Sequence, residues 1–160
     1  MRHPNDFYPT PPWVTQAVMP YVMRNIVWHE PACGDGAICK VLSESHVEYS
    51  FSDLNGAPIG MEGVNFLRDN TLRHGIVTNP PFSLAFEFCK HAVNHAPHVF
   101  MLLRLNFLAS QTRSEWFKRH EPGALFVLSR RPSFTSNGKT DSTDYAWFYW
   151  GPEHKGIKHI

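Results

Sequence analysis

The chain contains 160 residues, of which 42% are hydrophobic and 18% are charged, and its net charge at pH 7 is +1. This composition excludes a disordered chain, and no apolar stretch is long enough to span a membrane. The length fits one compact domain over residues 1–160, and the start of the chain lacks the apolar run of a signal peptide. The three cysteines show no Cys-x-x-Cys spacing, which favours free thiols in a reducing cytoplasm.

The first predicted elements are, in chain order, a helix at 10–22, a strand near 26–31 and a helix that begins at 37–42. A glycine-rich loop over residues 30–36 joins this strand to the second helix, as at the start of nucleotide-binding α/β units. Gly34 and Gly36 allow a tight turn and a close ligand approach, and the helix N-terminus offers N–H groups to an anion. The third glycine of a dinucleotide motif is absent, and a glycine-rich turn without a ligand is the alternative.

A second strand is predicted over residues 47–53, and it ends in Asp53. An acidic residue at this distance after a glycine turn commonly holds the hydroxyls of a ribose. The alternative is a turn-forming aspartate ahead of Asn55 and Gly56. A short apolar segment at 63–67 is predicted to end a further strand.

The sequence Asn79-Pro80-Pro81-Phe82 follows an apolar run that predicts a buried strand at 75–79. Each proline fixes its own φ and keeps the preceding residue extended, so this segment forms a rigid corner. The corner presents the side-chain oxygen of Asn79, the carbonyl oxygen of Pro80 and the flat ring of Phe82. These groups suit a planar molecule with an exocyclic amine. A stiff loop with Phe82 in the core is the alternative.

The remaining predicted elements are a helix at 84–96, a strand at 99–103, a helix at 110–120, and paired strands at 125–128 and 145–150 around a turn at 136–141. Leu84, Phe88 and Val93 are the expected core positions of the first of these helices, and Ser110 is the expected cap of the second. This alternation predicts an α/β fold with one doubly wound, mostly parallel, seven-stranded-type sheet and an antiparallel C-terminal strand. Ligands bind such sheets at the carboxyl ends of the strands.

Between residues 104 and 139 the chain carries seven basic residues against two glutamates, so the rest of the chain is net acidic. A basic surface beyond the Asn79 corner favours contacts with the phosphates of a nucleic acid. A solvated helix face and a charged hairpin are the alternative. The predicted nucleic-acid-binding residues are Arg104, Arg113, Lys118, Arg119, Arg130, Arg131 and Lys139. The ten histidines show no metal-binding spacing, so no metal is expected.

Several of these segments, in this order, resemble S-adenosylmethionine-dependent DNA adenine N6-methyltransferases, and most closely the small phage and prophage members. They are the start at 6–12, the glycine loop at 30–36, Asp53, the segment at 65–67, the corner at 79–82, and the late segments at 131–134 and 145–150. The resemblance implies a Rossmann-like class I methyltransferase with S-adenosylmethionine as cofactor. It implies direct methyl transfer to the N6 amine of adenine in DNA at the Asn79 corner. The base would be flipped out of a duplex or taken from a single strand.

The resemblance also implies which residues hold the cofactor. Thr10, in a segment that includes Tyr8, would meet the methionine carboxylate, and Asn65 and Phe66 would contact the cofactor adenine. The implied cofactor-binding residues are Tyr8, Thr10, Glu30, Ala32, Gly34, Gly36, Asp53, Asn65 and Phe66.

Two departures from the family pattern bear on the substrate. Asn65 replaces the usual acid, and the chain leaves no room for a separate target-recognition domain. A partner protein would then supply recognition, and a phage-encoded protein would act in the cytoplasm of a bacterial host. The alternatives are a methyltransferase acting on RNA or on a protein glutamine, and a non-catalytic cofactor-binding module.

Overall fold

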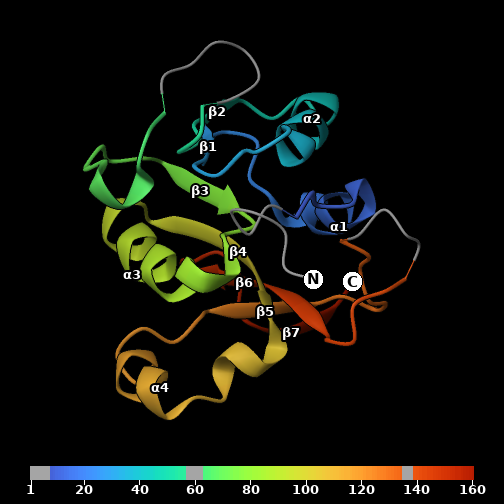
Figure 1. Cartoon of the computed structure of the whole chain (residues 1–160), viewed down its shortest axis with the longest axis vertical. Helices are drawn as coiled ribbons and strands as arrows, with labels where there is room; N and C mark the ends of the chain where they lie inside the picture. The colour runs from blue at the N-terminus through green and yellow to red at the C-terminus, as the bar shows by residue number, and fades with distance from the viewer. Residues whose placement is uncertain (1–7, 57–62, 135–138) are drawn as a thin grey trace.

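The computed structural model describes residues 8–56, 63–134 and 139–160. Seven strands form one sheet in the order β2-β1-β3-β4-β6-β5-β7 (Figure 1). The strands are β1 Trp28–Glu30, β2 Tyr49–Phe51, β3 Gly75–Thr78, β4 His98–Arg104, β5 Ala124–Val127, β6 Tyr145–Trp150 and β7 Gly156–His159. Strand β6 runs antiparallel to both of its neighbours, and every other pairing in the sheet is parallel. The predicted fold class, a mostly parallel α/β sheet with an antiparallel strand near the C-terminus, is confirmed.

The helices lie where the sequence predicted them, although most are shorter at their ends. The α-helices are α1 Pro12–Val18, α2 Ala37–Glu44, α3 Ala85–His95 and α4 Gln111–Phe117. Short 3-10 turns are η2 Met19–Tyr21, η3 Phe66–Arg68, η4 Phe82–Leu84 and η5 Leu105–Leu108. The prolines at the start of α1 are tolerated because the first turn of a helix has no intrahelical partners for its N–H groups. No helix in the described part of the chain is long and apolar enough to cross a bilayer.

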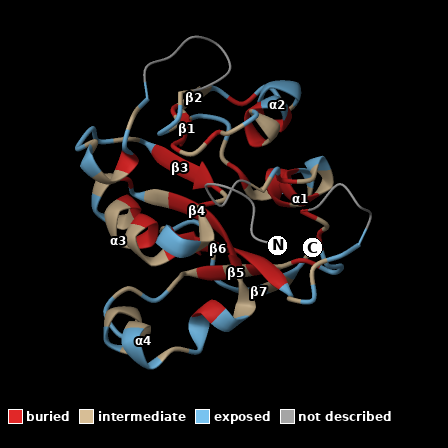
Figure 2. Cartoon of the chain, in the orientation of Figure 1, coloured by how far each residue is buried: buried red, intermediate tan, exposed pale blue. Residues whose placement is uncertain are grey.

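Two hydrophobic clusters, one on each face of the sheet, form the core (Figure 2). Alternate residues of β6 show the division, because Tyr145, Trp147 and Tyr149 join the cluster that contains α1 and α2. Phe148 and Trp150 join the cluster that contains α3 and the aromatic side chains of α4. This period-2 alternation makes a three-layer α/β/α arrangement, with both faces of the sheet covered.

The strand predicted at 63–67 is wrong, because η3 occupies the end of that segment. The side-chain oxygen of Asn65 accepts the N–H of Leu67 and caps η3, while the N–H of Val64 donates to the carbonyl oxygen of Asp53. Local hydrogen bonds therefore satisfy backbone groups that a strand would have directed to a neighbour.

Two finer predictions about helix ends are also wrong. Ser110 precedes α4, but its hydroxyl contacts the hydroxyl of Thr112 and makes no cap hydrogen bond. Leu84 ends η4 rather than joining the core of α3, and its side chain is exposed, whereas Phe88 is buried as predicted. The predicted turn at 136–141 lies partly outside the described residues.

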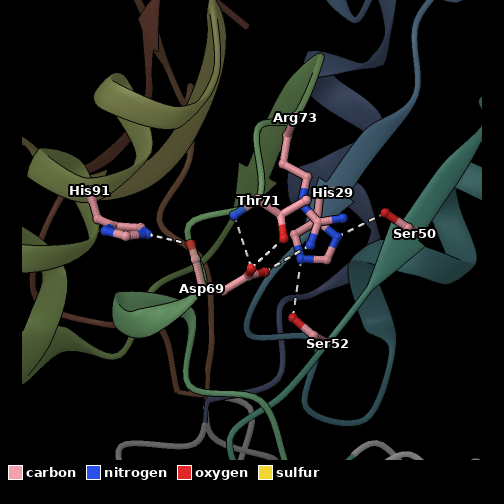
Figure 3. A network of polar contacts seen from close by, with 7 residues as sticks. All are labelled: His29, Ser50, Ser52, Asp69, Thr71, Arg73 and His91. Atoms are coloured by element: carbon pink, nitrogen blue, oxygen red, sulfur yellow. Dashed lines mark hydrogen bonds and ion pairs between the residues drawn. The ribbon is translucent and has the colours of Figure 1, made fainter.

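His29 of β1 connects this strand to β2 by hydrogen bonds to two serines (Figure 3). The Nδ1 of His29 lies 2.8 Å from the hydroxyl of Ser50, and its Nε2 lies 3.1 Å from the hydroxyl of Ser52. Burial lowers the pKa of His29 to about 4, so the ring is neutral at pH 7. This ring, in contact with the two serines, therefore does not change protonation state near neutral pH.

The segment between η3 and β3 is fixed by a second part of the same network (Figure 3). Asp69 pairs with Arg73 at 2.8 Å, and its carboxylate also accepts hydrogen bonds from Thr71. Burial opposes ionisation of Asp69, but the hydrogen bonds from Thr71 and Arg73 outweigh it and lower the pKa to about 2. His91 of α3 contacts the carbonyl oxygen of Asp69 at 2.9 Å, which joins the segment to the helix layer.

Candidate active site

A cavity of about 910 Å³ opens where β1, β2 and β3 end, so it lies at the carboxyl edge of the parallel part of the sheet. All of the predicted catalytic and cofactor-binding residues except Gly36 line it: Tyr8, Thr10, Glu30, Ala32, Gly34, Asp53, Asn65, Phe66, Asn79, Pro80, Pro81 and Phe82. Gly36 lines a neighbouring cavity of about 480 Å³ instead. Asp6 and Phe7, which begin the N-terminal motif, lie outside the described residues.

The glycine loop closes onto the end of the second strand. Gly34 and Gly36 adopt φ values of +51° and +82°, which favour glycine because a Cβ would be strained there. The N–H of Gly34 donates to Oδ2 of Asp53 at 2.9 Å, and Oδ1 of Asp53 accepts the N–H of Asn55 at 2.9 Å. The carboxylate accepts hydrogen bonds from two backbone amides, lines the cavity and has further lone pairs for other donors.

Glu30 places a carboxyl group deep in the cavity wall, with only 1% of the residue exposed. Its Oε1 accepts the N–H of Ala32 at 2.9 Å, and the nearby Thr78 hydroxyl opposes the rise of its pKa. Neither Oε2 nor the Thr78 hydroxyl makes a hydrogen bond of normal geometry within the described residues. Burial raises the pKa of Glu30 to about 8. A cationic group bound beside Oε2 would favour the ionised carboxylate and supply the missing partner.

Asn79 sits directly after β3 and is held by the N-terminal segment. Its Nδ2 donates to the hydroxyl oxygen of Thr10 at 3.0 Å and to the carbonyl oxygen of Tyr8 at 3.4 Å. Its Oδ1 is buried and has no hydrogen-bond partner in the described part of the chain. A buried acceptor without a donor is costly in a folded protein, and a bound molecule with an N–H group could supply the donor here.

The ring of Phe82 is already in contact with several other groups. The Tyr8 ring lies 5.0 Å from it, tilted by 32°, and the guanidinium of Arg104 lies 4.7 Å above it. Arg104 is fixed in turn, because its Nε donates to the hydroxyl of Tyr145 and the guanidinium lies 3.6 Å from Asp141. Phe82 therefore lines the cavity and also packs in an aromatic cluster. It has features of both predictions, a ring that faces a ligand and a residue of the core.

Part of the cavity wall is apolar. Phe66 is buried against Phe88, with ring centres 5.0 Å apart, and both line the cavity with Val64. Leu54 also lines the cavity although it is 59% exposed, and it is not among the residues predicted from the sequence. The sequence feature that could have indicated Leu54 is its position directly after Asp53, at the end of a predicted strand. Asn65 lies at the rim, where its Oδ1 already caps η3.

The seven predicted nucleic-acid-binding residues fall into two groups. Arg113, Lys118 and Arg119 belong to α4 and the turn after it, at the lower left of Figure 1. There Arg113 donates to the carbonyl oxygen of Phe107, and Lys118 pairs with Glu115 at 2.6 Å.

The other group lies on the side of the N-terminal segment, residues 8–11, where contact with Trp13 brings residue 130 against α1. Arg130 stacks over Trp13 of α1 at 4.2 Å, Arg131 pairs with Asp144 at 2.8 Å, and Lys139 is exposed. Arg104 at the end of β4 contacts Phe82 and thus links this group to the cavity. The seven cations do not form one continuous surface around a single element.

Within the described ranges, no three side chains of the types His, Cys, Asp or Glu gather in a metal-binding arrangement. His91 and His95 stack on one another with ring centres 4.0 Å apart, and His91 contacts the carbonyl oxygen of Asp69. Their one-turn spacing serves the packing of α3.

No family model and no curated protein matches the sequence. Many solved structures match its fold, including the following three. A proposed RNA methyltransferase from Pyrococcus horikoshii has 13% identity and a TM-score of 0.68, over 94% of this chain and 90% of that one. A proposed class I S-adenosylmethionine-dependent methyltransferase from Listeria monocytogenes has 9% identity and a TM-score of 0.59. The match covers 93% of this chain and 62% of the Listeria protein. A modification subunit of a proposed type I restriction enzyme from Vibrio vulnificus has 14% identity and a TM-score of 0.68. The match covers 96% of this chain and 47% of the Vibrio subunit.

The chain thus spans about half of the Vibrio subunit and most of the Pyrococcus protein. Identities this low show the fold alone. The sheet order, the helices on both faces and these likenesses together give the chain the Rossmann-like class I S-adenosylmethionine-dependent methyltransferase fold.

Proposed function

We propose that this protein transfers a methyl group from S-adenosylmethionine to the exocyclic N6 amine of adenine in DNA. The observation that carries the proposal is the unpartnered Oδ1 of Asn79, at the wall of a cavity that also contains the glycine loop and Asp53. An acceptor with no donor in the chain suits a substrate that brings an N–H group.

The residues around the cavity fit S-adenosylmethionine. The carboxyl group of Glu30, with one oxygen unpartnered, suits the ammonium of the methionine part, and the hydroxyl of Thr10 suits its carboxylate. Asp53 suits the ribose hydroxyls, and Phe66 with Leu54 suits the adenine. When bound, the cofactor supplies an electrophilic methyl group on a sulfonium.

The Asn79 corner would activate the amine by accepting its hydrogens. The lone pair of an aromatic amine is delocalised into the ring, so the nitrogen is a weak nucleophile. Hydrogen bonds to Oδ1 of Asn79 and to the carbonyl oxygen of Pro80 favour a pyramidal nitrogen with its lone pair free. The same two oxygens stabilise the positive charge that develops on the nitrogen. Asn79 is a weak base, so the proton is lost to solvent after transfer.

The target base must reach Phe82, and this requires a small rearrangement. Oδ1 of Asn79 is shielded from solvent, and the Phe82 ring is covered by Tyr8 and Arg104. A base that stacks on Phe82 therefore displaces one of these two side chains. Base–aromatic stacking contributes about 1–3 kcal/mol, and a flipped or single-stranded base is needed to gain it.

The DNA assignment draws on the cations near this corner and on the likeness to the Vibrio modification subunit. Arg104, Arg130, Arg131 and Lys139 lie on the side of the N-terminal segment, and cations on that side would favour contacts with phosphates. A partner protein would add recognition of a target sequence. The three buried free thiols, at Cys33, Cys39 and Cys89, suit a reducing compartment such as a bacterial cytoplasm.

The experiment that tests the proposal is incubation with labelled S-adenosylmethionine and unmodified DNA, RNA or total protein, followed by mass analysis of the products. We expect N6-methyladenine from DNA. The Asn79 corner could accept any planar amine. Label in RNA adenine or in protein glutamine would therefore show that DNA is not the substrate, while the proposed methyl-transfer reaction would stand. Absence of label in all three would contradict methyl transfer.

A non-catalytic cofactor-binding module is the second candidate. Asn65 favours it, because the amide oxygen expected to contact the cofactor adenine already caps η3. Calorimetry with S-adenosylmethionine and with its demethylated product separates the two candidates. Binding of both ligands without any transfer supports the module.

A further inference from the structure

We propose that Thr10 is a positioning residue that sets the orientation of the Asn79 side-chain amide, so that Oδ1 and not Nδ2 faces the incoming amine. This proposal rests on the proposed function, and it gives Thr10 a role beyond contact with the cofactor. The evidence is the pair of contacts that Nδ2 of Asn79 makes with the N-terminal segment.

An asparagine amide has two orientations related by a half-turn, and only one of them presents an acceptor to a substrate amine. The carbonyl oxygen of Tyr8 can only accept, and it lies 3.4 Å from Nδ2 of Asn79. The hydroxyl oxygen of Thr10 lies closer, at 3.0 Å. Turning the amide over would place Oδ1 against the Tyr8 carbonyl oxygen, which is repulsive. The N-terminal segment therefore specifies the orientation.

Thr10 is well placed to hold this orientation because it is 5% exposed and stands just before α1. Its hydroxyl has two lone pairs and one hydrogen. A free hydroxyl could accept from Nδ2 of Asn79 or donate to its Oδ1, so Thr10 selects the orientation when its hydrogen is given to another acceptor, such as a bound carboxylate. Its lone pair then accepts from Nδ2, in agreement with the orientation that the Tyr8 carbonyl oxygen favours. One hydroxyl group thus connects the cofactor end of the cavity to the amine corner.

The two roles of Thr10 predict different kinetics. If the hydroxyl only binds the cofactor carboxylate, its loss weakens cofactor binding and leaves kcat at saturating cofactor unchanged. If it positions Asn79, its loss lowers kcat even when cofactor and DNA are saturating. Loss of one neutral hydrogen bond that orients a catalytic group predicts a decrease of roughly 3- to 10-fold.

The test compares Thr10→Val with Thr10→Ser and with the matched control Thr15→Val. Valine keeps the shape and removes the hydroxyl, whereas serine keeps the hydroxyl and restores kcat. Thr15 is 1% exposed in α1, and its hydroxyl has no hydrogen-bond partner among the described residues. Its replacement should leave kcat and thermal stability near those of the wild type. An unchanged kcat in Thr10→Val, with DNA methylation intact in the wild type, overturns the proposal.

A second measurement does not depend on activity. Exchange of the Asn79 Nδ2 protons with water, followed by NMR, should become several-fold faster in Thr10→Val and stay unchanged in Thr15→Val. If the wild type methylates no substrate but this difference is present, the proposed function fails and the positioning role stands. Equal exchange in the wild type and Thr10→Val contradicts the positioning role whatever the substrate is.

Discussion

At the scale of single residues, the cavity holds two polar atoms that the described chain leaves without partners. Oδ1 of Asn79 suits a hydrogen-bond donor, and Oε2 of Glu30 suits a cation. These two atoms come from the ends of neighbouring strands, β3 and β1. Each is a cost to the free protein that a bound ligand removes, which is a common arrangement at functional sites.

Glu30 makes the stability of the protein depend on pH. Burial raises its pKa from an ordinary value near 4.5 to about 8, so the folded state holds a proton that the unfolded state releases. The stability of the wild type relative to Glu30→Gln is therefore greatest below pH 4.5 and falls as pH rises to about 8. Urea unfolding of both proteins at pH 5 and pH 8.5 measures the difference. Parallel pH profiles for the two proteins would show that the carboxyl is not buried as described.

At the scale of elements, β1 packs closely against β3 where the two strands begin. Trp28 is fully buried, its Nε1 donates to the carbonyl oxygen of Met23 at 2.8 Å, and it stands opposite Gly75 in the register of the two strands. A Cβ at position 75 would lie 2.6 Å from the Trp28 ring. The missing side chain of Gly75 therefore makes room for the indole.

The variant Gly75→Ala should accordingly be less stable, by about 1–3 kcal/mol, because the indole has no free space into which to move. Urea unfolding followed by tryptophan fluorescence measures the change. The control is Leu72→Ala, where the side chain is 77% exposed and the expected change is within about 0.5 kcal/mol. Equal stability of Gly75→Ala and the wild type would contradict the packing of β1 against β3.

The sequence was most informative for elements with strong apolar patterns. Residues 99–103 and 145–150 are buried runs, and both are strands in the structure. Strand β7, Gly156–His159, was not predicted, because it is a largely exposed edge strand with no hydrophobic alternation and only β5 as its neighbour. Residues 63–67 were predicted wrongly, since the side chain of Asn65 competes with backbone pairing.

At the scale of the whole molecule, the cavity could be predicted because parallel strands bring their carboxyl ends to one edge. The glycine loop, Asp53 and Asn79 follow three such strands. The contacts of Asn79 with Tyr8 and Thr10 could not be predicted, because about 70 residues separate the partners and no local pattern links them. The division of the basic residues into two groups also depends on the tertiary fold.

This division predicts unequal contributions to DNA binding. Arg130 stacks on Trp13 beside the N-terminal segment, whereas Lys118 pairs with Glu115 on the side of α4. The variant Arg130→Ala should weaken DNA binding and reduce the slope of log K against log salt by about one, as expected for one lost phosphate contact. The variant Lys118→Ala should change neither quantity. Fluorescence anisotropy over a series of salt concentrations measures both, and equal effects would contradict a DNA surface on the Arg130 side.

The most direct test of the proposed chemistry is a single-turnover measurement of methyl transfer to DNA by the wild type and by Asn79→Ala, together with the dissociation constant for S-adenosylmethionine. Loss of a charge-stabilising group in the transition state predicts a rate lower by about 100-fold or more, while the dissociation constant stays at the wild-type value. Transfer by Asn79→Ala at the wild-type rate would contradict the proposed role of this corner.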